Sequence, residues 1–264
     1  MLYKGNLEKM ISENNSEVVY TLPVGDDRID LNPFIGKNIQ LTFLDQINCV
    51  ACGKKTNKSF SQGFCYNCFQ SSPMASECIL RPDQCKAHLG VSRDMEWSKT
   101  HCLQPHIVYL AVSSNLKVGI TRQSQIPTRW IDQGASAAII LATVPNRHIA
   151  GTIEKYLMQY YSDKTSWQAM LKGTSAEVDL VAEKKVAASK LPVELQQYIQ
   201  KEDLLTQINF PVSAYPDKVK SDSFDKSKTV SGVLKGIKGQ YLIFEDNTVL
   251  NVRKHRGYLV EVSL

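Results

Sequence analysis

The stretch YLAVSSNLKVGITR, residues 109–122, decides the fold of the central part of the chain. Apolar and β-branched residues fill 106–112 and 116–121 on either side of a short polar segment, and this pattern predicts an antiparallel hairpin. The second strand contains Gly119, which weakens a strand interior, and Arg122 follows directly after it. A hairpin needs neither residue for its stability, so we expect the end of this hairpin to border a binding site.

The residues after the hairpin predict a compact α/β unit. PTRWIDQG (127–134) opens with a proline, which favours the first turn of a helix, and closes with a glycine. AAIILATV (137–144) is a fully apolar strand, and RHIAGTIEKYLMQYY (147–161) has one apolar helical face with Glu154 beside it. Two more helices complete the unit, at 176–189 and 192–201.

All seven cysteines lie between residues 49 and 102, and this clustering indicates metal binding rather than disulfides. CVACGKKTNKSFSQGFCYNC (49–68) contains two Cys-x-x-Cys pairs separated by twelve residues. Two such turns supply four thiolates in the tetrahedron that Zn²⁺ accepts, and Gly53 suits the left-handed turn after the first pair. We therefore predict a structural zinc site, the alternative being two redox motifs or buried thiols. The predicted ligands are Cys49, Cys52, Cys65 and Cys68.

CILRPDQCKAHLGVSRDMEWSKTHC (78–102) offers ligands for a second zinc ion at irregular spacing. We favour three cysteines and one histidine, and we place His88 ahead of His101 because His101 is adjacent to a cysteine. The alternative is three buried cysteines and two surface histidines. If the second site exists, the segment is a connector that folds on its metal, since it has few large apolar residues. The three cysteines are Cys78, Cys85 and Cys102.

Both ends of the chain predict short β segments, so the expected fold class is α+β. The predicted strands are 18–24, 37–45, 241–244, 248–252 and 258–264, with a charged, serine-rich linker at 217–228. Neither end has enough strands to be stable alone, so we expect the two to pair into one small barrel or sandwich. The predicted segments are N-terminal β (1–48), zinc-binding (49–104), α/β (105–200), and linker with C-terminal β (201–264).

The composition limits the possible partners. The 264 residues carry a formal net charge of +5, which permits a nucleic-acid partner without requiring one. Apolar residues make up 43%, enough to bury a core, but no run of eighteen apolar residues exists. The N-terminal MLYKGNLEKM lacks the apolar core of a signal peptide. We therefore expect a soluble, cytoplasmic protein without a membrane partner.

The order of the central elements resembles the GIY-YIG endonuclease superfamily over residues 107–165. Tyr109 stands for the first motif of that family, and Lys117-Val118-Gly119 stands for the second. Arg129 takes the place of the helix arginine, and Glu154 that of the metal-binding glutamate. The resemblance implies that Tyr109, Lys117, Arg129 and Glu154 form a catalytic set and that Glu154 holds Mg²⁺ or Mn²⁺.

Two features depart from the nuclease pattern. Lys117 replaces the second motif tyrosine, and Asp132 and Gln133 stand where nucleases often have a histidine. The matching residues also have structural interpretations: Gly119 permits close strand packing, Tyr109 is a core aromatic, and Arg129 pairs with Asp132 on its helix. Glu154, beside an apolar face, is then a boundary residue.

The chain as a whole resembles a bacterial protein family labelled domain of unknown function 2797. The shared features are the two Cys-x-x-Cys pairs, a second Cys/His group and a VYLA…KVGITR…PTRWIDQGA block. Members of that family often have a cysteine at the position of Ser92, so His88 or His101 would have to complete the second zinc site here. This resemblance implies no activity.

We expect a protein with one to two zinc ions that binds nucleic acid, DNA or RNA, on a basic surface and cleaves it little or not at all. One alternative is a metal-dependent endonuclease of the GIY-YIG type, and a weaker one is an anion pocket around Arg122, Arg129 and Gln133. The usual role of a lysine run is a solvated loop. The residues expected to contact nucleic acid are Lys54, Lys55, Lys58, Gly119, Thr121, Arg122, Arg129, Arg253, Lys254 and Arg256.

Overall fold

The computed structural model describes residues 1–264, and they form a mixed α+β fold with three sheets and short helices. The chain divides into two compact units. Unit 1 comprises residues 1–70, 171–173 and 209–264, and unit 2 comprises residues 71–170 and 174–208. The predicted zinc-binding segment, 49–104, therefore contributes its first four cysteines to unit 1 and its last three to unit 2. None of the helices has both the length and the apolar character to cross a membrane.

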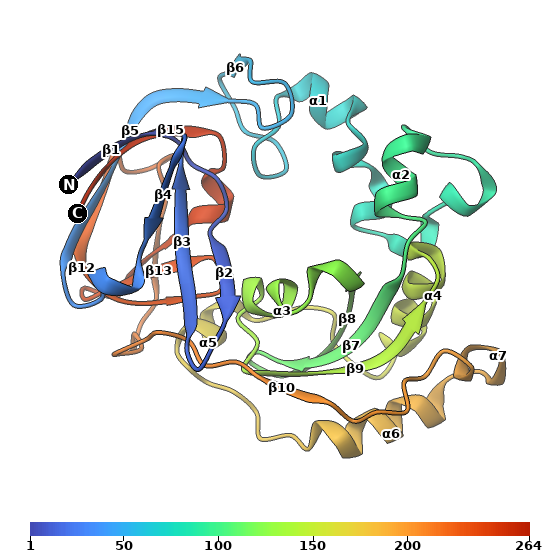
Figure 1. The fold of residues 1–264 in the computed structure, drawn as a ribbon. Coiled ribbons are helices and arrows are strands. Elements are labelled where there is room, and N and C mark those ends of the chain that lie inside the picture. The colour runs from blue at the N-terminus through green and yellow to red at the C-terminus, as the bar shows by residue number, and fades with distance from the viewer. The chain divides into compact units, whose positions relative to one another are not determined.

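Unit 1 is built on an eight-stranded sheet that joins the two ends of the chain (Figure 1). Its strands run in the order β1 (Leu2–Asn6), β15 (Tyr258–Ser263), β5 (Asn38–Asn48), β12 (Thr229–Lys238), β13 (Tyr241–Phe244), β14 (Thr248–Asn251) and β11 (Lys220–Asp222), with β6 (Lys55–Thr56) paired to β5. A second sheet has the order β2 (Ile11–Asn14), β3 (Val18–Val24), β4 (Asp27–Asp30). Short 3₁₀ turns lie at Asn32–Phe34 and Val252–His255.

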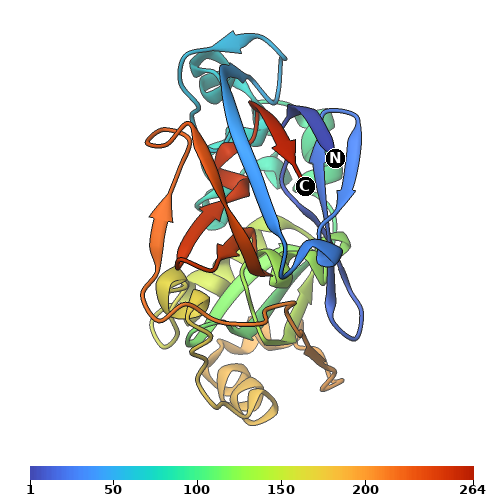
Figure 2. The same ribbon diagram turned by 90° about the vertical axis from the view of Figure 1, so that its left-hand side faces the viewer.

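The expected pairing of the two ends is found, because β1 and β5 both lie antiparallel to β15 (Figure 2). Buried apolar residues alternate along these strands, so Val262 pairs with Leu41 in the interior. Closure into a barrel or sandwich stays a prediction. The linker predicted at 217–228 is not wholly irregular, because it contains β11, which runs parallel to β14.

Unit 2 has a four-stranded antiparallel sheet in the order β10 (Leu205–Gln207), β9 (Ala137–Val144), β7 (His106–Val112), β8 (Leu116–Arg122). The predicted hairpin and apolar strand are therefore confirmed. The helices of this region are α2 (Met95–His101), α3 (Thr128–Asp132), α4 (Arg147–Leu157), α5 (Trp167–Leu171), α6 (Leu180–Lys190) and α7 (Val193–Gln196). A 3₁₀ turn lies at Gln123–Gln125.

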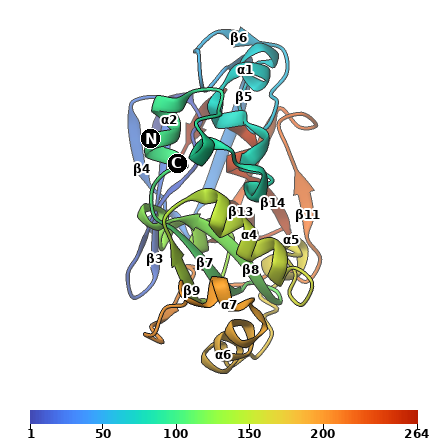
Figure 3. The ribbon, with the colours of Figure 1, turned by 90° about the vertical axis from the view of Figure 1, so that its right-hand side faces the viewer.

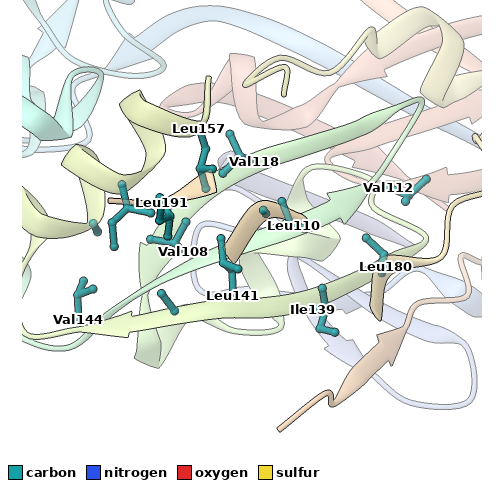
Figure 4. Packing of buried hydrophobic residues seen from close by; sticks show 14 residues of the cluster. Val108, Leu110, Val112, Val118, Ile139, Leu141, Val144, Leu157, Leu180 and Leu191 are labelled. Atoms are coloured by element: carbon teal, nitrogen blue, oxygen red, sulfur yellow. The ribbon is translucent and has the colours of Figure 1, made fainter. Parts of the chain in front are cut away.

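The two faces of this sheet have different neighbours. Side chains alternate along β7, so Val108, Leu110 and Val112 lie on one face, packed with residues of α4 and α6 in one apolar core (Figure 4). Tyr109 lies on the other face, where its ring meets Trp130 of α3 edge-on at 5.9 Å. Lys117 and Gly119 of β8 share the face of Tyr109, whereas Glu154 belongs to α4, which packs on the opposite face and contacts the edge strand β8.

The segment from Ser71 to Gln104 folds as a chain of short turns followed by α2 (Figure 3). Four 3₁₀ turns come first, at Pro73–Ala75, Glu77–Ile79, Pro82–Gln84 and Ala87–Leu89. α4 packs closely on the third of these turns, since a Cβ at Gly151 would lie 2.2 Å from the backbone nitrogen of Asp83. This close approach fixes the cysteine-bearing turns against the helix that carries Glu154.

Candidate metal centres and a cluster of charged residues

The first four cysteines converge on one point in unit 1. The Sγ atoms of Cys49, Cys52, Cys65 and Cys68 all lie within 4.8 Å of one another, and those of Cys52 and Cys65 are 3.9 Å apart. Four thiolates around Zn²⁺ at about 2.3 Å lie about 3.8 Å from one another. The cysteines are free rather than disulfide-bonded. Their number, chemistry and spacing therefore fit a zinc ion.

Backbone geometry prepares the first cluster for thiolates. Gly53 has φ +70°, as predicted for the left-handed turn, and its N–H donates to the carbonyl of Cys49 at 2.8 Å. Burial disfavours ionisation of the Cys49 thiol, but backbone N–H groups, first that of Cys65, outweigh burial and lower its pKa to about 6. A thiol with this pKa is largely ionised at neutral pH, the state in which it binds metal.

The second cluster, in unit 2, contains three cysteines and no histidine. The Sγ atoms of Cys78, Cys85 and Cys102 lie within 4.8 Å of one another. The structure does not bring either predicted histidine to this group. The His88 ring stacks on His148 with centroids 4.3 Å apart, and the His101 ring stacks on Trp97 at 4.0 Å. The cluster thus offers three ligands to zinc, and the proposed fourth is not His88 in this arrangement.

Two arginines lie beside the second cluster. Arg147 is only 9% exposed, and its guanidinium donates to the carbonyls of Cys78 at 3.4 Å and His101 at 3.2 Å. Its backbone N–H donates to the carbonyl of Cys102 at 2.8 Å. Arg122 lies close enough to Arg147 and Cys102 for their charges to act on it. Burial and then the charge of Arg147 lower the pKa of Arg122, and the charge of Cys102 raises it. The two guanidinium groups favour ionised thiols by their positive charge.

The anion-pocket alternative around Arg122, Arg129 and Gln133 stays a prediction, but Arg122 and Lys117 are separated on their strand. On β8, side chains alternate between faces, so Lys117, Gly119 and Thr121 share the face of Tyr109 while Arg122 lies on the opposite one. The alternation of side chains along a strand, visible in the sequence, already predicts that Arg122 lies on the opposite face from Lys117, Gly119 and Thr121.

The four predicted catalytic residues come together around the hairpin. Gly119 lies opposite Tyr109, and a Cβ at this position would be 2.7 Å from the tyrosine Oη. The Tyr109 hydroxyl is fully buried and donates to Gln133 Oε1 at 2.8 Å. Lys117, Arg129 and Glu154 are close enough for their charges to act on one another. Glycine is needed here because the tyrosine ring lies directly over it, in agreement with the packing interpretation.

Burial favours the uncharged forms of Lys117 and Glu154 and shifts the pKa values of both groups. Lys117 is 3% exposed, and burial, followed by the charge of Arg129, lowers its pKa to about 8. Burial and then the charge of Asp163 raise the pKa of Glu154 to about 7, although Arg129 and Lys117 act in the opposite direction. Burial also raises the pKa of the Tyr109 hydroxyl. We name these residues, with Asp163, the charged cluster; its members are Tyr109, Lys117, Arg129, Glu154 and Asp163.

Glu154 and Asp163 line a pocket of about 340 Å³, together with Arg81 and Lys155. Lys155 is paired with Asp83 at 2.7 Å. Tyr109 and Lys117 do not line this pocket and are almost completely buried, so Glu154 and Asp163 are the members of the charged cluster that border it. Asp163 was missed in the sequence because it lies in a polar loop after α4, where nothing distinguishes it from a surface residue.

The basic residues predicted in unit 1 have different environments. Lys54, Lys55 and Lys58 are exposed in the loop between the two cysteine pairs. Arg256 is instead ion-paired with Glu8 at 2.8 Å, and Lys254 with Asp225 at 3.5 Å. Arg253, close to both in sequence, is half-buried. The lysines between the cysteines are therefore the most available of these cations.

Comparison with the curated proteins and with the solved structures found no match. A family model described as "Protein of unknown function (DUF2797)" matches residues 36–260. This range includes both cysteine clusters and the charged cluster. The chain therefore belongs to the DUF2797 family of proteins of unknown function.

Proposed function

We propose that this chain is a zinc-containing nucleic-acid-binding protein. The observation that carries the proposal is the loop between the two cysteine pairs of unit 1, the zinc loop (residues 53–64). Lys54 and Lys55 are exposed on it without an ion-pair partner, and Lys58 lies over the Phe60 ring at 5.3 Å from the centroid. Lysines that are held by a metal-bound framework and not neutralised by the protein are suited to phosphate contacts.

An exposed aromatic ring lies next to this loop. Tyr66, at the start of α1 (Tyr66–Ser71), is 59% exposed and meets Phe60 edge-on at 5.6 Å. Phe60 in turn stacks on Phe69 at 5.9 Å, so the outer ring is backed by two others. Exposed aromatic faces beside lysines bind single-stranded nucleic acid by stacking on its bases. This arrangement favours a single-stranded partner over a duplex.

Removal of two lysines tests the proposal directly. We expect the Lys54→Ala, Lys55→Ala double variant to bind a fluorescent single-stranded oligonucleotide several-fold more weakly than the natural chain at low salt. The matched control is Lys4→Ala, Lys218→Ala, which removes the same charge at exposed positions of unit 1 outside the zinc loop. Equal loss of binding in both double variants would show that only the net charge matters and not the zinc loop. Unchanged binding in the zinc-loop variant would reject the proposal.

Phosphodiester hydrolysis is the second candidate, supported by the charged cluster. A hairpin, a following helix with Arg129 and a later helix with Glu154 are the parts of a GIY-YIG-like unit, and here they gather four residues of that pattern. Groups with pKa values near neutrality, as for Lys117 and Glu154, suit proton transfer. In this candidate Glu154, with oxygens of the substrate, holds Mg²⁺ or Mn²⁺. The buried Tyr109 hydroxyl argues for weak turnover at most.

Glu154→Gln separates the two candidates. In the second candidate this variant loses Mg²⁺- or Mn²⁺-dependent cleavage of mixed DNA and RNA substrates and retains binding. In the first candidate there is no cleavage to lose. Cleavage shared equally by the natural chain and the variant identifies a contaminant. We expect binding without robust cleavage.

A further inference from the structure

The three-cysteine cluster of unit 2 borders a pocket, and this juxtaposition has a chemical consequence. We propose that a metal ion held by Cys78, Cys85 and Cys102 takes its fourth ligand from solution and that this ligand is the sulfur of a small thiol. Structural zinc sites have four protein ligands, whereas sites with three keep one position open to a solute.

The chain supplies no fourth donor to this cluster. The His101 ring stacks on Trp97, with its Nδ1 3.0 Å from the Trp97 carbonyl oxygen and 2.9 Å from Thr100 Oγ1. The His88 ring stacks on His148. No carboxylate oxygen or imidazole nitrogen joins the three thiols within the 4.8 Å that encloses them.

The open side of the cluster leads into a pocket of about 490 Å³. All three cysteines line it, Cys78 as the half-buried member and Cys85 and Cys102 with only 3% and 1% of their surface exposed. Trp97, Val91 and Ser92 form other parts of the wall, and Lys86 adds an exposed cation. A volume of this size admits a small organic molecule.

The charges around the cluster favour a thiolate as this ligand. Zn²⁺ with three thiolates has a net charge of −1, and a fourth thiolate brings it to −2. Arg147 and Arg122, both beside the cysteines, bring two positive charges. They offset the charge of the four-thiolate complex, and Lys86, Arg93 and Glu77, which also line the pocket, add one further net positive charge. Thiolates are also the soft donors that zinc in a sulfur-rich site retains.

The binding step is a ligand exchange. The thiol gives its proton to the solvent, its sulfur forms a bond to the metal, and the weakly bound solvent ligand leaves. Nothing is oxidised or reduced. Ser92 lines the same pocket as the three cysteines, so Ser92→Cys places a fourth thiol of the chain where we infer the external one to bind.

The test uses the full chain loaded with Co²⁺, whose thiolate-to-metal absorption increases with the number of sulfur ligands. Addition of 2-mercaptoethanol should increase this absorption in the natural chain, and ethylene glycol, its oxygen analogue, should not. Cys85→Ser should lose the response while the four-cysteine cluster keeps its own absorption. Ser92→Cys should show the higher absorption without added thiol and respond no further.

Absence of a response in the natural chain, or a response that persists in Cys85→Ser, would overturn the inference. If either variant fails to fold, X-ray absorption on the zinc-loaded natural chain decides. The average number of sulfur ligands per zinc should lie below four without added thiol, because the clusters supply four and three. It should rise to four with 2-mercaptoethanol, and an unchanged value would contradict the proposal.

Discussion

Tyr109 and Gly119 face each other across the central hairpin, and their contact leaves no space for a side chain on the glycine. A Cβ added to Gly119 would lie 2.7 Å from the tyrosine Oη, which is shorter than a carbon–oxygen contact allows. Gly119→Ala should therefore displace the Tyr109 ring and break its hydrogen bond to Gln133. We expect a loss of about 1–3 kcal/mol in the free energy of unfolding, measured by urea denaturation. A variant as stable as the natural chain would contradict this expectation and show that the hairpin accommodates the added methyl group.

Glu154 should make stability depend on pH in a defined range. Its pKa is raised from an ordinary value of 4.5 to about 7, so between these values the folded state binds more protons than the unfolded state. Stability from this group is complete below pH 4.5 and is lost as pH rises through 7. From about pH 5 to about pH 7.5 the natural chain should lose on the order of 2 kcal/mol relative to Glu154→Gln.

Denaturant titrations at both pH values check this expectation. The exposed Glu177→Gln is the matched control, because it makes the same chemical change outside the charged cluster. A pH dependence that is identical in the natural chain and Glu154→Gln would place the shifted group elsewhere.

The sequence allowed Tyr109, Lys117, Arg129 and Glu154 of the charged cluster to be named, but neither Asp163 nor the burial of the group. Strand and helix periodicity put Tyr109 and Glu154 on their elements, and the resemblance put Lys117 and Arg129 beside them. The charges of Arg129, Glu154 and Asp163 act on Lys117, and its backbone pairs with Ser162, so its environment depends on distant parts of the chain that no local pattern encodes. The same limit explains why Arg147, beside the second cysteine cluster, was missed: its position at a helix start gives no sign of the cysteines.

Among the elements, the two Cys-x-x-Cys turns were predictable because their ligands are close in sequence and one ion explains all four. β12 was missed because Gly232 and Gly236 and its lysines weaken the strand pattern. Tertiary contact explains Gly236, since a Cβ there would lie 2.6 Å from Val212 Cα. The pairing of β1 with β15 joins the two ends of the chain, and such long-range registers are not written in either strand alone.

The zinc loop should lose its structure when one of its ligands is removed. We expect the natural chain to contain two zinc ions and Cys65→Ser to contain one, because metal binding supplies the folding free energy of this segment. Proteolysis should then cut within residues 49–68, which the natural chain protects. Elemental analysis and mass spectrometry of the fragments measure both effects.

Cys85→Ser is the matched control, since it removes a thiol from the other cluster and should leave residues 49–68 protected. Absence of zinc from the natural chain after purification without chelators would reject both centres. Zinc retained in full by Cys65→Ser would reject the four-cysteine assignment.

At the scale of the whole molecule, the two units carry different chemistry. Unit 1 holds the four-cysteine cluster with its exposed lysines, and unit 2 holds the three-cysteine cluster and the charged cluster. The net charge of +5 describes the whole chain, but only cations that are not paired with carboxylates of the chain are free to contact phosphates. Composition alone could not show that Arg256 and Lys254 are paired and that Lys54 and Lys55 are not.

The salt dependence of nucleic-acid binding tests the central claim most directly. Each phosphate neutralised on a single strand contributes about −0.7 to the slope of log K against log salt concentration. We predict a linear fall for the natural chain and a slope shallower by about 1.4 for Lys54→Ala, Lys55→Ala, since two contacts are lost. No binding of a single-stranded oligonucleotide at about 50 mM salt and micromolar protein, or an identical slope in the two proteins, would contradict the account.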